Sequence, residues 1–315
     1  MKLFIRKIIS FVLTCLILFL GIVLAEKFIL NKKGNFKLTD EQKYVILGHS
    51  HAQMDYEDKY IDSSENLASS GEAYFYTYIK LNKILESNEQ KKVLFIEFTN
   101  NNIVKEMNKW IWDDMHIDDR YRLYWAYTSF DERKILYANN PYAALVSDIK
   151  SIVNNVYYIF TLKHIATDGK MGGYLKLERN KTDSLIIANE INPNPMDTSL
   201  SETNILYLKK IIDLCQKKRV DVYLIRSPLH PKYEGYGNEF KFKELLNGEF
   251  KDVEFLDFAN YLVPNSEFGD LEHLNFVGAK KYSLFFNRLM KEGLLQKNNK
   301  QRFIDEQIAN EIRKQ

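Results

Sequence analysis

The chain has 315 residues, of which 45% are hydrophobic and 27% are charged. These proportions are typical of a folded globular protein and exclude global disorder. Its 44 Lys and Arg against 42 Asp and Glu leave a formal charge of +2. No strongly basic face is implied, so we expect no nucleic-acid partner. The 2 cysteines are too few for a disulfide framework or a cysteine-rich zinc site.

The N-terminus predicts a membrane-associated segment. An uncharged apolar run over residues 8–25 follows a basic start made of Lys2, Arg6 and Lys7. At about 1.5 Å per residue this run nearly spans a hydrocarbon core of roughly 30 Å. A cleaved signal peptide is the alternative, because Val23 and Ala25 stand where signal peptidase prefers small residues. We favour an uncleaved signal anchor over residues 1–26.

Residues 27–42 are polar and Lys-rich, which predicts a tether. Beyond them, short apolar runs alternate with segments of helical periodicity. Short apolar runs predict buried strands at 44–47, 93–98, 220–225 and 253–257. Helical periodicity is present at 73–88, 205–217 and 278–291. Strands that alternate with helices indicate a sheet of parallel strands covered by helices. We therefore predict a three-layer α/β/α sandwich with a mostly parallel, flavodoxin-like sheet over residues 43–292.

The composition changes between about residues 104 and 200, where all 3 tryptophans and many tyrosines lie among helical stretches. We interpret this region as a helical insertion into the α/β domain. Packing of extra helices explains its aromatic content most simply, and lining of a substrate cleft is the other interpretation. Residues 293–315 are charged and predict a helical tail.

Polar residues that follow the predicted strands are the candidates for chemistry, because ligands bind at the carboxyl ends of strands in open parallel sheets. Ser50 lies in a Gly-His-Ser-His turn after the first strand, where a serine would present its hydroxyl to solvent. Asn100, Asn101 and Asn102 follow the second strand. Gly71 precedes a helix and lets the backbone approach a ligand closely.

A carboxylate and an imidazole stand three residues apart near the C-terminus, as Asp270 and His273. The Asp of such a pair can orient the ring and stabilise the imidazolium that forms when His takes a proton from a nucleophile. Taken alone, the pair is equally consistent with a helix-capping Asp beside a surface His.

In this order the four segments resemble the blocks of the SGNH (GDSL-like) hydrolase superfamily. The most specific match is Asp270-x-x-His273-Leu274-Asn275. The resemblance implies that Ser50 is the nucleophile and that Asp270 and His273 complete its catalytic triad. It also implies an oxyanion site.

The oxyanion site implied by the resemblance consists of Gly71 and Asn100, with Asn101 or Asn102 as alternative donors. The chain departs from the family in two blocks. His49 stands where the family normally has Asp, and Phe98-Thr99-Asn100-Asn101 stands where it normally has Gly-x-Asn-Asp.

The activity implied by the resemblance is that of a serine esterase or O-acyltransferase, without metal or cofactor. The membrane segment and the insertion are similar to those of extracytoplasmic members that act on acyl esters of cell-envelope or extracellular polysaccharide. We therefore expect an acylated glycan as substrate, membrane contact through the N-terminal helix, and a catalytic domain in the bacterial periplasm or on the cell surface. Hydrolysis and transfer both remain open.

Two other functions fit parts of the sequence. A non-catalytic SGNH-like protein that binds a glycan or an assembly partner is the main alternative, although such a protein needs no complete set of Ser, His and Asp. The Gly48-His49-Ser50-His51 turn also fits the Gly-His-x-His of calcineurin-like metallophosphoesterases. That family also needs an Asp-x-His before this turn and a Gly-Asn-His, and the chain has neither.

Overall fold

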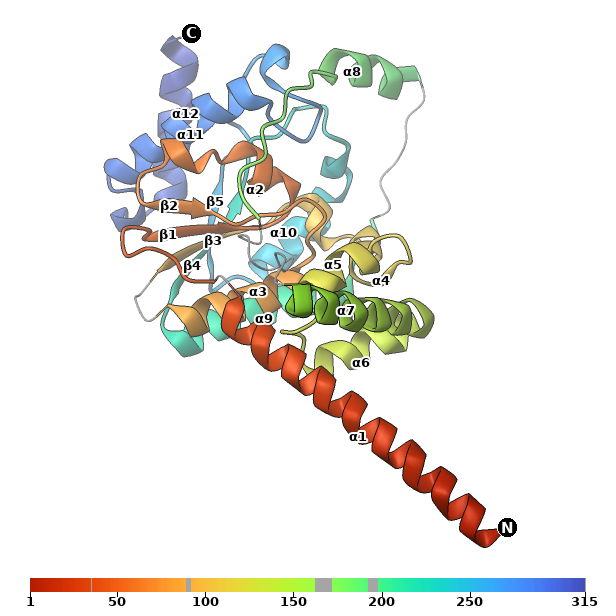
Figure 1. Cartoon of the computed structure of the whole chain (residues 1–315). Helices are drawn as coiled ribbons and strands as arrows, with labels where there is room; N and C mark the ends of the chain where they lie inside the picture. The colour runs from red at the N-terminus through yellow and green to blue at the C-terminus, as the bar shows by residue number, and fades with distance from the viewer. Residues whose placement is uncertain (35, 89–91, 162–171, 192–197, 315) are drawn as a thin grey trace. The chain divides into compact units, whose positions relative to one another are not determined.

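The computed structural model describes residues 1–34, 36–88, 92–161, 172–191 and 198–314 (Figure 1). The chain divides into two compact units. We call residues 1–36 and 112–170 the helical unit, and residues 37–111 and 171–315 the α/β unit. The predicted insertion at about 104–200 thus belongs to both units. Its segments 162–171 and 192–197 lie outside the described residues.

The α/β unit contains a sheet of five strands in the order β2-β1-β3-β4-β5, with every neighbouring pair parallel. This is the strand order of flavodoxin-like doubly wound sheets. The strands are β1 (Tyr44–Leu47), β2 (Ser64–Asn66), β3 (Val93–Glu97), β4 (Asp221–Arg226) and β5 (Glu254–Asp257). The predicted parallel α/β fold is therefore confirmed. No predicted strand corresponds to β2, because Ser-Glu-Asn at the sheet edge carries no apolar pattern.

Helices cover both faces of this sheet (Figure 1). One layer contains α3 (Tyr74–Ser87) and α9 (Glu202–Lys218), which pack against each other. The other contains α2 (Ser50–Asp55), α11 (Phe276–Lys291) and α12 (Lys300–Lys314). Alternate strand residues, such as Ile46 and Phe95, share a buried core with this second layer, as expected for side chains that alternate between the faces of a strand.

The predicted tail at 293–315 is part of that core. Its helix α12 buries Ile304 and Ile308 among the residues of α11 and the sheet. Its remaining surface carries the charges that the sequence shows. Burial of two isoleucines on one face of a charged helix makes the C-terminus an integral element of the α/β unit.

The described part of this unit also contains further helices and short 3₁₀ turns. The helices are α8 (Thr182–Ile191) and α10 (Glu239–Asn247). The 3₁₀ turns are η1 (Asp58–Tyr60), η2 (Asn100–Ile103), η3 (Lys105–Asn108), η4 (Glu234–Asn238), η5 (Asn265–Glu267) and η6 (Leu294–Gln296).

The helical unit contains α1 (Lys2–Lys33), α5 (Ile117–Tyr124), α6 (Phe130–Asn139) and α7 (Pro141–Thr161), and the short α4 (Lys109–Trp112) ends where this unit resumes. Helix α1 continues through residues 27–33, so the first part of the predicted tether is helical. Among the described residues, one helix is long and apolar enough to cross a membrane, over Lys2–Lys32. A signal sequence would have the same length and composition.

Candidate active site

Ser50 is the first residue of α2 and follows β1 through a tight turn. Gly48 in this turn has a φ of +154°, and a Cβ there would lie 2.4 Å from the Cβ of Glu97, so the turn needs glycine. Glu97, the fully buried last residue of β3, accepts hydrogen bonds at Oε2 from the main-chain N–H groups of His49 (2.8 Å) and Ala52 (2.9 Å). Its carboxylate therefore caps the start of α2 and holds the turn that presents Ser50.

A chain of hydrogen bonds joins Ser50, His273 and Asp270. Nε2 of His273 lies 2.7 Å from Oγ of Ser50, and Nδ1 lies 2.9 Å from Oδ1 of Asp270. The same Oδ1 accepts from the main-chain N–H groups of Glu272 and His273, each at 2.8 Å. The three side chains thus form a hydroxyl–imidazole–carboxylate array. Ser50 and His273 are 223 residues apart along the chain.

His49 makes a second contact with the hydroxyl of Ser50, with Nδ1 2.8 Å from Oγ. In the neutral form of His273, Nδ1–H donates to Asp270 and Nε2 accepts from the Ser50 hydroxyl. Oγ must then accept from Nδ1–H of His49, a tautomer assigned from the network of bonds. His49 thereby orients the lone pairs of the Ser50 hydroxyl.

The pKa of Asp270 is held well below its usual range. Burial alone would raise the pKa. The hydrogen bond to His273, the charge of His273 and the hydrogen bond from Arg179 together lower it by more than burial raises it. The carboxyl group therefore stays ionised at the pH of any physiological compartment, as an orienting carboxylate must.

This shift predicts a pH-dependent stability difference for Asp270→Asn. Because the folded pKa is depressed, Asp270 stabilises the fold fully above its unfolded pKa of about 3.9, and this contribution is lost as the pH falls through the folded pKa. Thermal unfolding of the detergent-solubilised full chain should show Asp270→Asn less stable than wild type at neutral pH. The difference should narrow below about pH 5. A difference that is constant down to acid pH would contradict this assignment.

An extended segment at residues 172–181, which we call the strap, crosses the site; Figure 1 shows it running from α8 past α2. Its main chain bonds to both halves of the site: Leu175 N–H donates to the carbonyl of Gln53 in α2 (3.0 Å), and Lys181 N–H donates to the carbonyl of Gly269 (2.9 Å). Arg179 of the strap forms an ion pair with Asp270. The strap therefore ties α2, which begins with Ser50, to the loop that carries Asp270 and His273.

A cavity of about 350 Å³ opens beside this ion pair. Arg179, Lys181, Tyr233, Asp270 and Glu272 are among its lining residues. Its lining mixes both signs of charge with apolar surface, and it borders the carboxylate end of the array.

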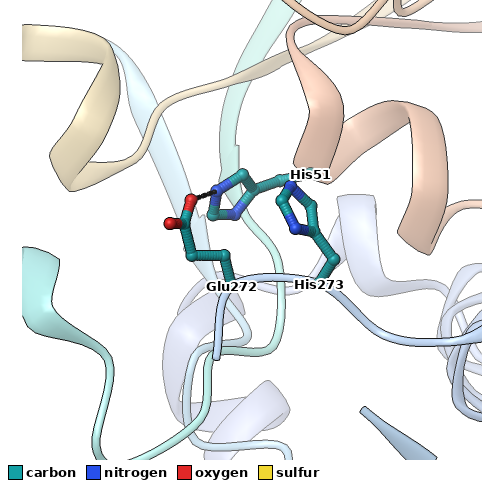
Figure 2. Close-up of side chains that lie close together, drawn as sticks. All are labelled: His51, Glu272 and His273. Carbon is teal, nitrogen blue, oxygen red and sulfur yellow. Dashed lines mark ion pairs between the residues drawn. The ribbon is translucent and has the colours of Figure 1, made fainter. Parts of the chain in front are cut away.

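A second histidine is packed against the array. His51 is completely buried, its Nε2 lies 3.4 Å from Oε2 of Glu272, and its ring centroid lies 4.8 Å from that of His273 (Figure 2). Burial alone would lower the pKa of His51, but the hydrogen bond to Glu272 and the charges of Glu97, Glu272 and Asp55 raise it to about 9. His51 is therefore an imidazolium at neutral pH.

We predict that this buried charge makes stability fall at alkaline pH. A group whose folded pKa is raised stabilises the fold fully below its unfolded pKa, about 6.5 for His, and loses that contribution as the pH rises through the folded value. The melting temperature of wild type should therefore drop relative to that of His51→Gln between neutral pH and pH values above about 9. Parallel pH curves for the two proteins would show that His51 is neutral throughout.

A metal site is another possible use of these side chains. The possible ligand atoms of His51, Glu272 and His273 lie within 4.8 Å of one another. Tetrahedral zinc at about 2.0–2.2 Å from each ligand needs ligand atoms roughly 3.4 Å apart, so the group would have to contract. Both ring nitrogens of His273 already face partners, Ser50 and Asp270. The observed contacts fit an ion pair beside a proton-transfer chain more directly than a metal centre.

Of the two residues predicted for the oxyanion site, Gly71 packs against a tryptophan that contacts the array, and Asn100 bonds to other partners. Gly71 has a φ of +71°, and a Cβ there would lie 2.4 Å from the ring of Trp110. The same ring packs edge-on against His49, with centroids 6.0 Å apart. Among the described residues, the side chain of Ser50 bonds to His49 and His273 and not to Gly71.

The side chain of Asn100 is used elsewhere. It is fully buried, donates to Asn238 (3.1 Å) and Glu239 (2.7 Å), and accepts from Arg226 (3.2 Å). It therefore ties η2 to η4 and α10 instead of facing Ser50. Asn101, the next residue, has the side chain that lies beside the histidines.

The amide of Asn101 lies 3.0 Å from Nε2 of His51. A protonated His51 donates from Nε2, so Asn101 then presents its oxygen to it and its NH₂ group to Thr99, an amide orientation assigned from the network. Thr99 in turn can donate to Asn102, whose Oδ1 lies 2.8 Å away. The protonation state of His51 and the orientation of Asn101 are thus coupled.

Four contributors to this site escaped the sequence analysis. Glu97 is hidden at the end of an apolar strand, and His51 was assigned only to an alternative motif. Glu272 carried no signal beyond its place between Asp270 and His273. Arg179 lies 91 residues before its partner, in a segment without a motif, and no local pattern could have indicated it.

Comparison with known protein families gives a match over part of the chain. A family model for an uncharacterised domain matches residues 173–295. The match includes the strap, Asp270 and His273 but not Ser50, and it covers less than half of the chain. No curated protein matches the chain.

Proposed function

We propose that the protein is a serine esterase or O-acyltransferase of the SGNH (GDSL-like) type. The observation that carries this proposal is the continuous hydrogen-bond chain from Asp270 through His273 to Ser50. It lies after the carboxyl end of β1 in an open parallel sheet, where ligands of such sheets bind. The ionised state of Asp270 matches its role in the mechanism.

The reaction begins when His273 removes the hydroxyl proton of Ser50 while Oγ attacks the ester carbonyl. The tetrahedral intermediate collapses, and the imidazolium of His273 returns the proton to the departing alcohol. Water or a sugar hydroxyl, deprotonated by His273, then attacks the acyl-serine and releases the acid or a new ester. Asp270 stays ionised throughout and stabilises the imidazolium.

Negative charge on the carbonyl oxygen needs donors near Ser50. Candidates are the main-chain N–H groups of Ser50 and Gly71 and, after reorientation, the side chain of Asn101. Each such donor contributes roughly 10²–10³ in rate. Asn100, with its amide already bonded to two partners, is a weaker candidate than Asn101.

The proposed substrate is an acyl ester of a cell-envelope or extracellular polysaccharide. Helix α1 supports a location at the membrane, because an apolar N-terminal helix of this length suits a membrane anchor. The placement of the rest of the chain on the outer side follows from the resemblance to extracytoplasmic members of the superfamily. The proposed location is the bacterial periplasm or cell surface.

Labelling with a fluorophosphonate probe tests the proposal on the detergent-solubilised full chain. We expect wild type to be labelled at Ser50, Ser50→Ala to remain unlabelled, and EDTA to have no effect. Ser70→Ala is the matched control, since Ser70 lies in a neighbouring loop and bonds to Gln53 without touching His273. No labelling of folded wild type, or equal labelling of Ser50→Ala, would overturn the proposal and favour the glycan-binding alternative. Loss of labelling in EDTA would favour a metal centre.

A further inference from the structure

Helix α7 of the helical unit buries small residues and exposes large apolar ones, which is the reverse of an ordinary surface helix. Its buried residues are small: Ala143, Ala144, Ser147 and Ser151. Its exposed residues are large and apolar: Tyr142, Leu145, Ile149, Val153, Tyr157 and Phe160. At about 100° per residue the exposed set lies on one face, opposite the buried set.

The rotation of α7 is fixed by a polar contact. Asp148 accepts hydrogen bonds from Trp125 (2.6 Å), Tyr121 (2.8 Å) and Tyr137 (2.6 Å), and it forms an ion pair with Arg133. These partners come from α5, α6 and the turn between them. Turning α7 to bury its apolar face would leave this carboxylate and its donors without partners, which is costly in a buried setting. The exposure of the apolar face is therefore built into the unit.

The candidate membrane span packs on the same helix. Helix α1 contacts α7, and α1 is buried only near its end, at Glu26 and Leu30. There, Tyr127 donates to the carbonyl of Leu30 (3.2 Å) and Asn31 donates to the carbonyl of Ala126 (3.4 Å). The exposed apolar part of α1 precedes this docked part directly.

The distance along α1 places the docked part at the edge of a bilayer. From Ala25, the last residue of the apolar run, to Leu30 the helix rises about 7.5 Å. The headgroup layer on each side of the hydrocarbon core is of similar thickness, about 5–8 Å. A span formed by α1 therefore holds the helices packed on it at headgroup level.

We propose that the apolar face of α7 lies in the interfacial layer of the bilayer, beside the span formed by α1. Interfacial helices bury one apolar face at the headgroup boundary, and tyrosines such as Tyr142 and Tyr157 are favoured at that depth. The helical unit then contacts the membrane both through α1 and along α7. The inference rests on α1 remaining in the bilayer and is independent of the catalytic array.

The test compares two adjacent positions on α7 in the full chain, reconstituted in phosphatidylcholine–phosphatidylglycerol vesicles. Val153→Cys lies on the apolar face, whereas Asn154→Cys lies on the half-buried side of α7, seven residues after the buried Ser147. Each is made in a Cys15→Ala background that retains the buried Cys215. Each introduced cysteine carries an environment-sensitive fluorophore, and nitroxide lipids serve as the quencher. We expect a blue-shifted emission and strong lipid quenching at position 153, and weaker effects at position 154.

Three results would overturn the proposal. Equal quenching at positions 153 and 154 would show that the apolar face does not point to the bilayer. Energy transfer between copies labelled at position 153, without lipid quenching, would identify a second copy as the occupant. Failure of the protein to float with the vesicles would remove the span on which the inference rests. Fluorophosphonate labelling of the same samples reports separately on Ser50.

Discussion

Substitution of Ser50 by alanine is expected to lower kcat/KM for ester cleavage by about 10⁴–10⁶-fold, the range seen when a serine nucleophile is removed from a triad. The variant loses the atom that forms the acyl bond, while the turn that presents it stays capped by Glu97. We therefore expect little change in thermal stability. The measurement is the rate of p-nitrophenyl acetate hydrolysis by the detergent-solubilised full chain.

Three companion variants sharpen this prediction. His273→Gln should lose nearly as much activity, and the double variant should be no worse than either single one, because the nucleophile and its base act as one unit. Ser70→Ala should keep wild-type turnover. Ser50→Ala with more than a tenth of the wild-type rate would exclude Ser50 as the nucleophile.

The largest expected effect on stability follows substitution of Glu97. Removal of its carboxylate in Glu97→Ala leaves the buried N–H groups of His49 and Ala52 without an acceptor, at about 1–3 kcal/mol each. It also opens a cavity beneath the turn at Gly48. We expect the free energy of unfolding to fall by about 2–5 kcal/mol and the activity to fall with it, because the start of α2 loses its cap.

Glu97→Gln distinguishes the hydrogen bonds that cap α2 from the negative charge of the Glu97 carboxylate. A glutamine keeps a carbonyl oxygen that can accept both bonds, so most of the stability should return. The comparison is made by denaturant unfolding of the two variants and wild type under one set of detergent conditions. Equal destabilisation in Glu97→Gln and Glu97→Ala would show that the negative charge, not the hydrogen-bond geometry, stabilises the turn.

Four of the five strands were visible in the sequence as apolar runs. β1, β3, β4 and the edge strand β5 coincide with such runs, whereas the other edge strand, β2, consists of the polar residues Ser-Glu-Asn and has no such run. The same logic located Ser50, which directly follows β1. Asp270 and His273 were recognisable because their contact is local and depends on a spacing of three residues.

The parts of the site that depend on tertiary contacts were not visible. Whether Asn100 or Asn101 faces the histidines depends on the rotation of the η2 turn, which Arg226 and Glu239 set from distant elements. Arg179 reaches Asp270 only because the strap crosses the site. The exposure of the apolar face of α7 could likewise not be predicted from periodicity. An apolar face on a helix does not show which side of the helix the contacts of Asp148 turn inward.

The central claim is that Ser50 is a nucleophile activated by His273 and Asp270. Its most direct test is to mix the full chain with p-nitrophenyl acetate, quench the reaction in acid within its first turnovers, and map the acyl group by peptide mass spectrometry. The hydrogen-bond chain predicts one acetyl group on the peptide containing Ser50 in wild type and none in His273→Gln at the same time point. An unmodified Ser50 in wild type that still releases nitrophenol would contradict it.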